Sequence, residues 1–525
     1  MATTSRPIPA PAVVKSAAPE YKSGIAVVFA LALAKFAILL WVIRGYGYFR
    51  DELYYLALAQ HPLGWGYVDL PPLLVVITKA VRDSFGTSLV AIRFLPAVAG
   101  AATVWLGGML AREMGGRRWA QILAALATSV ALVYWPLSHI LSMNAFEPLF
   151  WMGSAWTVAK IARTGNQRWW LWTGVLVGLG VLNKYSMVFF AVAVVIGILL
   201  TPLRTSFKYP WIWMGIILAV AMAYPNFEWQ ASHHFPFLEL MRNIRHSGRD
   251  TALGPFQFLK QQMLIMNPVT LPAILSGLGW LLYSRQGNRF RALGVAFLVL
   301  LGFMILTHGK DYYLAPAYVM LFAAAGVFFE THLRSWLTGS IFALYILALL
   351  SGLVLVPLTI PILSEEAFIA YANKIGVHPS ESETHRQNAL GQFFADMHGW
   401  PEMAEKVADA YNTLTPEEQA DTVIFAQNYG EAGAIDLFGE SLGLPKAISG
   451  HQQYWYWGPK GSKGGNLLLL GRHSVGDLPQ HCQEVREMGQ VGTEWSIPYE
   501  HWTIYFCRNV DVNLADIWPR EKAWD

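Results

Sequence analysis

The sequence contains little charge for its length. Only 14% of its 525 residues are charged and 54% are hydrophobic, whereas about a quarter of a soluble protein is charged. A water-soluble core cannot absorb that much apolar surface, which excludes an ordinary soluble protein. The formal net charge of +3 is also too small to indicate a nucleic-acid partner.

Nucleotide-binding fingerprints are missing as well. The sequence contains neither a Walker motif nor a glycine-rich Rossmann fingerprint. It also has no convincing internal repeat, a feature that is common in secondary transporters. A nucleotide site is therefore not indicated, and a transporter is not favoured.

Long apolar runs dominate what the sequence does contain. A run of about 20 apolar residues spans the bilayer core as a helix, because backbone polar groups in lipid must be paired internally. The first run, 24–43, is too long for a signal-peptide core, and Arg44 follows it instead of a small-residue cleavage site. Further spans are expected near 88–111, 119–138, 145–162, 169–183, 186–202, 211–226, 261–283, 292–307, 313–329 and 336–360. The sequence thus predicts an α-helical polytopic membrane protein with about eleven transmembrane helices.

The distribution of lysine and arginine predicts the orientation. These residues gather at one set of helix ends: Lys15, Lys22, Arg112, Arg117, Arg118, Arg163, Arg168, Arg204, Lys208, Arg285, Arg289, Arg291 and Arg334. The opposite ends mix both signs, as in Arg50-Asp51-Glu52. The positive-inside rule places the basic ends in the cytoplasm, so we expect an inner-membrane protein with a cytoplasmic N-terminus. An odd number of spans then puts the C-terminal region outside.

The chain divides into three regions. Residues 1–23, rich in Pro, Ala and Ser, predict a disordered cytoplasmic N-terminus. Residues 24–361 form the membrane domain, which has a long first outer loop at 44–87. Residues 362–525 are polar, with a helical pattern over 400–414 and strand patterns over 422–427, 466–470 and 502–507. This alternation predicts a small extracytoplasmic α/β domain.

The only two cysteines, Cys482 and Cys507, both lie in this C-terminal region. Disulfides persist outside the cytoplasm, so we expect a bridge between them. It would join a strand that ends at Cys507 to a helix-like stretch that begins at Cys482. The alternative is a pair of separate, buried thiols.

Acidic residues in the first outer loop are candidates for chemistry. Asp51 and Glu52 are adjacent, and ionisable groups beside a membrane are costly to keep. They could form a general base with a metal-binding or hydrogen-bonding partner. They could instead cap a helix and interact with its dipole. Asp69, shortly before Pro71-Pro72, could be a ligand or an ordinary helix cap.

Other polar residues lie at outer helix ends. Asn144 and Glu147 share one helix face, where Asn144 could be a cap and Glu147 could face a polar cavity. Lys184 and Lys310 could bind a phosphate; alternatively, Lys184 snorkels and Lys310 pairs with Asp311. The outer loop near 227–260 adds His233, His234, Arg242 and Arg245, of which the arginines suit a lipid phosphate. A histidine pair alone is more often not a metal site.

The order of these motifs resembles that of bacterial membrane glycosyltransferases of the GT-C type. The most similar groups are related to protein O-mannosyltransferases, the lipid A aminoarabinose transferase and rhizobial galacturonosyltransferases (glycosyltransferase family 39/83-like). The resemblance covers about residues 24–330. It rests on Asp51-Glu52 with Tyr54-Tyr55, Asp69 to Leu73, Arg93, the Leu-x-Lys turn at Lys184, and Lys310 with Tyr312-Tyr313 and Pro316.

This resemblance implies an inverting transferase that takes a sugar from a polyprenyl phosphate. The acceptor would be a lipid, glycan or protein hydroxyl on the outer face. Asp51 would be the base, and Glu52 and Asp69 would organise the site or bind a divalent metal, for which His233 and His234 are further candidates. The residues implied for the donor phosphate are Lys184, Lys310, Arg242, Arg245 and Tyr313. Many relatives have Asp where this chain has Asn144, so Glu147, one turn on, would supply the charge.

Two other functions stay open from the sequence. A transporter or flippase of lipid-linked sugars would favour charges at the membrane midplane, whereas the charges here gather at outer helix ends. A non-catalytic envelope-assembly protein would not need Asp51-Glu52. The sequence identifies neither the sugar nor the acceptor.

Overall fold

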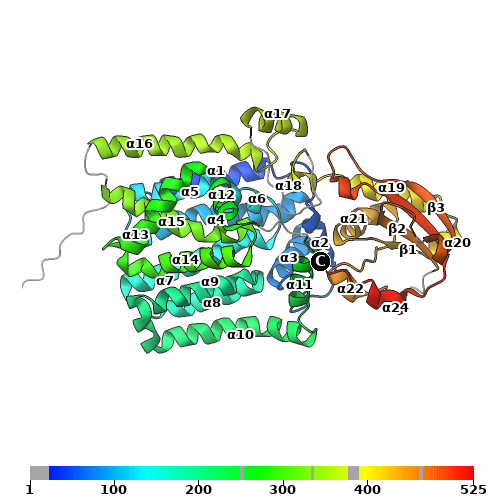
Figure 1. The fold of residues 1–525 in the computed structure, drawn as a ribbon, viewed down its shortest axis with the longest axis horizontal. Helices are drawn as coiled ribbons and strands as arrows, with labels where there is room; N and C mark the ends of the chain where they lie inside the picture. Colours follow the sequence, from blue (N-terminus) through cyan, green and yellow to red (C-terminus); the bar gives the residue numbers. More distant parts are fainter. Residues whose placement is uncertain are drawn as a thin grey trace, which may run out of the picture.

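The computed structural model describes residues 23–248, 253–332, 336–376, 389–459, 465–476 and 478–524. Its fold has two parts, a bundle of long helices and a smaller α/β domain beyond one end of that bundle (Figure 1). The helices α2 (Arg50–Gln60), α3 (Leu73–Phe85) and α11 (Pro236–Ser247) lie between the two parts. The expected disordered segment 1–23 falls, apart from its last residue, outside the described residues.

The bundle is built from apolar helices. They include α1 (Ile25–Trp41), α4 (Leu89–Glu113), α5 (Arg118–Val130), α7 (Met143–Thr164), α8 (Trp169–Asn183), α9 (Ser186–Leu199), α10 (Pro210–Ser232), α14 (Arg291–Thr307), α15 (Ala315–His332) and α16 (Trp336–Ser351). Among the described residues, five helical stretches are long and apolar enough to cross a membrane, or eight if each of three bent pairs is one span. The polytopic helical fold is confirmed, while the count of eleven stays a prediction.

Two expected spans are bent instead of straight. The segment 261–283 contains α12 (Pro255–Ile265), η3 (Pro268–Thr270) and α13 (Leu271–Tyr283), with a bend of 93°. Asn267 at the break has a φ of 70°, and Pro268 has no N–H with which to continue the helix. The segment 119–138 is likewise α5 followed by η1 (Leu132–Tyr134) and α6 (Pro136–His139), bent by 73°.

A single side chain connects the two breaks. Asn267 Nδ2 donates to the carbonyl of Val130, at the end of α5, at 3.1 Å, and to that of Gly352 at 3.0 Å. Broken helices are tolerated at membrane depth where such groups satisfy the freed backbone.

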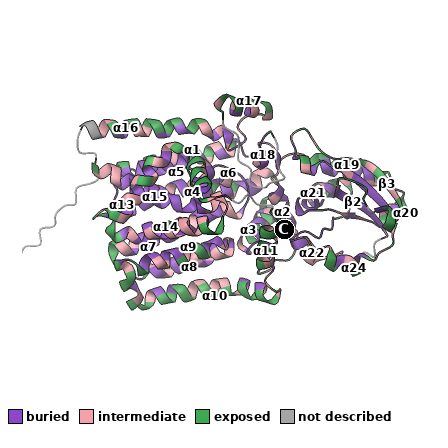
Figure 2. Ribbon diagram, viewed as in Figure 1, coloured by how far each residue is buried: buried purple, intermediate pink, exposed green. Residues whose placement is uncertain are grey.

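Helix α15 is the core of the bundle, and α10 and α16 lie at its outer edges (Figures 1 and 2). Neighbouring helices reach α15 at glycines. A Cβ on Gly277 of α13 would lie 2.0 Å from the carbonyl oxygen of Leu321, and one on Gly326 would lie 2.2 Å from that of Ala120 in α5. Backbones therefore touch where a side chain would not fit, which is how helices associate closely in lipid.

The C-terminal domain is a four-stranded sheet in the order β1-β2-β4-β3. Strand β1 (Thr422–Phe425) is parallel to β2 (Asn466–Arg472), and β4 (Thr503–Val510) is antiparallel to both β2 and β3 (Cys482–Gln490). The helices of this part are α17 (Glu365–Ile375), α18 (Gln392–Ala395), α19 (Trp400–Asn412), α20 (Pro416–Ala420), α21 (Tyr429–Phe438), α22 (Gln453–Trp457), α23 (Leu478–His481) and α24 (Leu514–Ile517). The predicted small α/β domain is present.

The expected bridge between Cys482 and Cys507 is present, with Cα atoms 5.3 Å apart. It joins β3 to β4, so the expectation of a helix starting at Cys482 is wrong. The residues that follow pair with β4 as an edge strand, with Glu484 opposite Arg508 and Arg486 opposite Phe506. Charged side chains are typical of an edge strand, whose outer side is not covered.

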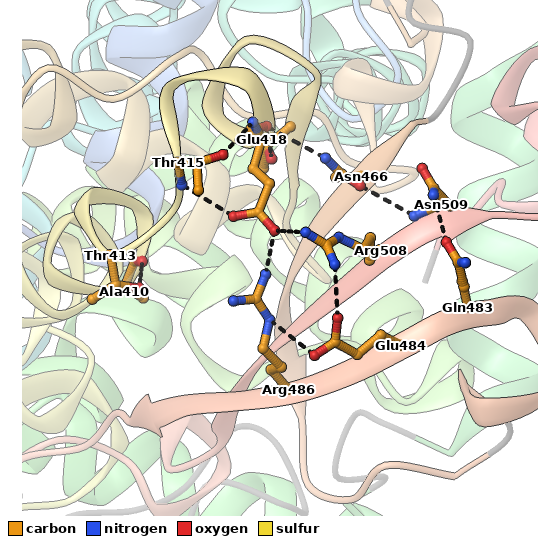
Figure 3. A network of polar contacts seen from close by, with 11 residues as sticks. Ala410, Thr413, Thr415, Glu418, Asn466, Gln483, Glu484, Arg486, Arg508 and Asn509 are labelled. Atoms are coloured by element: carbon orange, nitrogen blue, oxygen red, sulfur yellow. Dashed lines mark hydrogen bonds and ion pairs between the residues drawn. The ribbon is translucent and has the colours of Figure 1, made fainter.

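An ion-pair network fastens α20 to this edge (Figure 3). Glu418 accepts hydrogen bonds from Arg486 at 2.7 Å and from Arg508 at 2.6 Å. Glu484 pairs with the same two arginines, at 3.7 and 3.2 Å. The backbone N–H of Thr415, followed by the two arginines, holds the pKa of Glu418 below its usual value.

Candidate active site

Glu52, at the start of α2, is a wholly buried acid. Its carboxylate binds Arg93 of α4 at 2.7 and 2.9 Å, and both side chains are 0% exposed. It also accepts hydrogen bonds from the backbone N–H groups of Phe49 at 2.9 Å and Leu141 at 2.7 Å. Both oxygens are therefore occupied. Glu52 fixes α2 on the bundle, and any metal would have to displace Arg93.

The neighbouring Asp51 has a different environment. Its side chain is 31% exposed, and its Oδ1 accepts a hydrogen bond from the hydroxyl of Tyr429, in α21, at 2.8 Å. The guanidinium of Arg50 lies 3.8 Å from the same oxygen. Of the two adjacent acids, Asp51 is thus the one that a substrate can reach, and one of its partners comes from the C-terminal domain.

Asp69 follows α2 in the same outer loop. Its Oδ1 accepts a hydrogen bond from Tyr54 of α2 at 2.8 Å. Burial, and then Asp69 itself, raise the pKa of Tyr54 well above its usual value, so its hydroxyl keeps its proton. The backbone N–H of Gln453, in the C-terminal domain, donates to the Tyr54 oxygen at 3.3 Å. This second acid is therefore also linked to the C-terminal domain.

Lys184, directly after α8, occupies a polar cage. Its Nζ donates to Asn144 at 2.7 Å and to Glu147 at 2.9 Å, and lies 4.4 Å from the ring centre of Tyr313. The hydroxyl of Ser186 donates to the other oxygen of Glu147. Asn144 thus serves as an acceptor for the ammonium. Glu147, buried beside it, carries the balancing charge.

Tyr55 of α2 connects the acids with the lysine cage. Its side chain is buried, and burial is the largest cause that raises its pKa. The further causes are its neighbours Asp51, Asp69, Tyr429 and Tyr312, the last of which lies 5.6 Å from the Lys184 ammonium. Hydrogen bonds also join the two groups, because Nε2 of Gln230, in α10, donates to the carbonyl of Tyr67, near Asp69, at 3.0 Å and to the hydroxyl of Tyr185, next to Lys184, at 3.1 Å. Both groups therefore belong to one site, which includes α2 between the bundle and the C-terminal domain (Figure 1).

The remaining predicted residues differ in their burial. Lys310 is half-buried on the segment that carries Tyr312 and Tyr313. Arg242 and Arg245 are exposed on α11. His233 stacks on Trp229 at 4.1 Å, and His234 is exposed.

The predicted metal ligands do not form a common set. Within the part of the chain that the structure describes, no three His, Cys, Asp or Glu side chains are close enough to hold a metal ion together. Glu52, Asp69, His233 and His234 are therefore not gathered around one point, and Arg93 already neutralises Glu52. A divalent metal stays a prediction.

Comparison with known proteins identifies the architecture. Residues 69–229, less than half of the chain, match the family described as dolichyl-phosphate-mannose-protein mannosyltransferase. No curated protein sequence matches the chain.

Solved structures match over nearly the whole chain. ArnT from Cupriavidus metallidurans bound to undecaprenyl phosphate has a TM-score of 0.58 at 12% identity, covering 92% of this chain and 97% of that protein. The same protein in the apo state gives 0.60 at 13% identity, with coverages of 93% and 98%. The chain has the GT-C fold. The arabinofuranosyltransferase AftD from Mycobacteria is also similar, at a TM-score of 0.51 and 15% identity, over 93% of this chain and 40% of that protein.

The resemblance inferred from the sequence motifs is thereby confirmed. The GT-C fold and the family match support glycosyltransferase activity as a class. Sequence reasoning missed Tyr429 as a member of the site, because 378 positions separate it from Asp51. The only local signal is the Asn428-Tyr429-Gly430-Glu431 turn, which is typical of a helix start.

Proposed function

We propose that this GT-C protein is an inverting glycosyltransferase. It moves a sugar from a polyprenyl phosphate to a lipid, glycan or protein hydroxyl on the outer face of the inner membrane. The observation that carries the proposal is the difference between the two acids at the start of α2. The carboxylate of Glu52 is buried in an ion pair with Arg93, whereas the side chain of Asp51 is partly exposed. A purely structural role requires only a buried carboxylate such as that of Glu52, whereas a general base such as Asp51 must be accessible to the substrate.

The likeness to ArnT supports the choice of donor. That protein has been solved with undecaprenyl phosphate bound, and its fold matches this chain along nearly its full length. In this chain, Lys184 would interact with the phosphate through the ammonium proton that is not used by Asn144 or Glu147. Arg242, Arg245, Lys310 and Tyr313 would contribute as the donor approaches.

The reaction is a single displacement. Asp51 removes the proton of the acceptor hydroxyl while the hydroxyl oxygen attacks the anomeric carbon from the face opposite the phosphate. The bond between that carbon and the phosphate oxygen breaks, and the polyprenyl phosphate leaves with the electron pair. A positioned base accelerates such a step about 10²–10⁴-fold, and the cations stabilise the leaving phosphate. No step is assigned to a metal.

The proposed topology has the N-terminus in the cytoplasm and the C-terminal domain outside. Basic helix ends support it. Arg163, at the end of α7, pairs with Glu113 at the end of α4 at 2.6 Å, and the N–H of Arg117 donates to Glu330, near the end of α15, at 2.6 Å. These residues share one end of the bundle. An alkaline phosphatase fusion after residue 365 should be active, and an inactive fusion would contradict the proposed orientation.

Replacement of Asp51 tests the reaction. Asp51→Asn keeps the size of the side chain and removes its basicity, so transfer should fall by about 100-fold or more. Asp83→Asn is the matched control, since Asp83 lies in the same outer loop but pairs with Lys79 at 3.0 Å on the exposed face of α3. The lipids and glycans that are lost in a deletion strain, identified by mass spectrometry, supply the donor and acceptor for the assay.

The assay is best done with purified protein in detergent. A transferase works there, whereas a flippase of lipid-linked sugars produces nothing without two membrane sides. Retention of more than about a tenth of the wild-type rate by Asp51→Asn would eliminate the general-base role.

A further inference from the structure

Helix α21 of the C-terminal domain packs directly on α2, with its backbone against the acidic helix. A Cβ on Gly433 would lie 2.9 Å from the carbonyl oxygen of Leu53, and a Cβ on Gly430 would lie 2.6 Å from Cγ of Arg50. These glycines are three residues apart and so share one helix face. Larger side chains there would push α21 away from Asp51.

Tyr429, the first residue of α21, is held firmly at this contact. Its ring stacks on His451 with centroids 4.8 Å apart and planes 7° apart, and its centroid lies 4.7 Å from that of Tyr54, with the two planes tilted by 30°. The guanidinium of Arg50 lies 5.4 Å from its ring centre. The backbone N–H of Tyr429 donates to Nδ1 of His451 at 3.2 Å. The hydroxyl therefore has one well-defined place, 2.8 Å from Asp51.

The backbone that carries Tyr429 is also fixed. Asn428 caps α21 by accepting hydrogen bonds from the N–H groups of Gly430 at 2.8 Å and Glu431 at 3.0 Å. Glu431 is wholly buried and accepts from the N–H of Gln427 at 2.8 Å. A cap with both partners in place sets where the first turn of a helix begins, and thus where Tyr429 points.

We propose that Tyr429 is a positioning residue for the Asp51 base, so that the C-terminal domain is part of the catalytic site. This inference rests on the proposed transferase function. The hydroxyl of Tyr429 and the guanidinium of Arg50 both contact Oδ1 of Asp51, which leaves Oδ2 to take the acceptor proton. A carboxylate fixed in this way needs no reorientation during the reaction.

A merely structural contact makes a different prediction. If Tyr429 only attached the domain to α2, loss of its hydroxyl would lower stability and leave the pH dependence of the reaction unchanged. A hydrogen bond to the charged carboxylate favours its charged form. Loss of that bond should therefore move the acidic limb of the pH–rate profile to higher pH.

Tyr429→Phe removes only the hydroxyl and keeps the stacked ring. We expect kcat to fall about tenfold, with donor KM changed less than about twofold, because the base is misplaced while Lys184 and the residues around it are unchanged. The acidic limb should move to higher pH. Tyr411→Phe is the matched control, since the Tyr411 hydroxyl, in the same domain, donates to the backbone carbonyl of Gln419 at 3.0 Å, a hydrogen bond that involves neither Asp51 nor Tyr429.

A second measurement does not need turnover. Carbodiimides modify protonated carboxyl groups, and the pH midpoint of Asp51 labelling can be followed by peptide mass spectrometry. The midpoint should rise in Tyr429→Phe and stay unchanged in Tyr411→Phe. Equal midpoints in wild type and Tyr429→Phe would overturn the inference.

The two proposals fail in different ways. If the wild type transfers no sugar, or Asp51→Asn transfers as well as wild type, the proposed function fails and the positioning role of Tyr429 fails with it. If Asp51→Asn is inactive but Tyr429→Phe keeps the wild-type rate and pH profile, the transferase stands and the positioning role is wrong.

Discussion

In the helical bundle, neighbours meet at glycines, as where Gly277 and Gly326 bring α13 and α5 onto the backbone of α15. In the C-terminal domain, the edge of the sheet is fastened by a disulfide and by the Glu418–Arg486–Arg508 network. Lipid offers no hydrophobic drive for helix association, so close packing must replace it. A small domain in water gains instead from covalent and ionic links. The candidate site lies between the two, and each part contributes residues to it.

Removal of Arg93 should have the largest effect on stability. Arg93→Met would leave the buried charge of Glu52 without its partner, and breaking a buried pair in this way costs about 3–5 kcal/mol. Thermal unfolding in detergent should show a much lower midpoint. The double variant with Glu52→Gln is the control, since no buried charge then remains and part of the stability should return. An unchanged midpoint in Arg93→Met would show that the pair does not hold α2 on the bundle.

Loss of the disulfide should affect only the other region. Replacing Cys482 and Cys507 by Ala should destabilise the C-terminal domain by about 3 kcal/mol on the chain-entropy estimate. Hydrogen–deuterium exchange should become faster in peptides from β3 and β4 and stay unchanged in α13 and α15. Faster exchange throughout the bundle would contradict the separation of the two regions.

A smaller, pH-dependent effect is expected from a buried acid of α21. Burial, and then the neighbouring Glu500, raise the pKa of Glu431 well above its usual value. The folded domain thus binds this proton more tightly than the unfolded chain. Domain stability should be fully present below the ordinary pKa of Glu and should fall as pH rises toward the raised pKa, by at most about 1.4 kcal/mol per pH unit.

Glu431→Gln is the variant that checks this pH dependence. The amide cannot ionise, so the decline in stability with pH should become shallower when unfolding is followed by exchange of the β1 and β4 peptides. If the stability of the variant declined with pH as steeply as that of the wild type, the pH dependence would come from another group.

Local patterns predicted much of this fold. Apolar runs gave the bundle helices, because spanning a membrane requires continuous apolar sequence. The bends at Ala131 and Asn267 were missed, although Pro268 was a visible signal for the second. The strand at Cys482 was also missed, because an edge strand with charged residues lacks clear alternation.

The site was predictable in composition but not in the role of each residue. The sequence pointed to Asp51, Asp69, Asn144, Glu147 and Lys184, all of which the structure brings to one end of the bundle. The resemblance assigned the base to Asp51 and not to Glu52, but the residues themselves did not show which of the two is buried, since neighbouring residues on a helix point in different directions and the position of Arg93 decides it. Tyr429 was beyond reach, because its contact with Asp51 depends on the packing of α21 on α2.

The distance in sequence between Asp51 and Tyr429 sets an order of events during synthesis. At about 5–20 residues per second, the 378 positions from Asp51 to Tyr429 take about 20–75 seconds to translate. Asp51 is thus made early, and the residue proposed to position it arrives only after the bundle has been threaded into the membrane. A chain that is still being inserted would carry the acid without its partner, and the proposed sugar transfer would begin only once the C-terminal domain has folded onto α2.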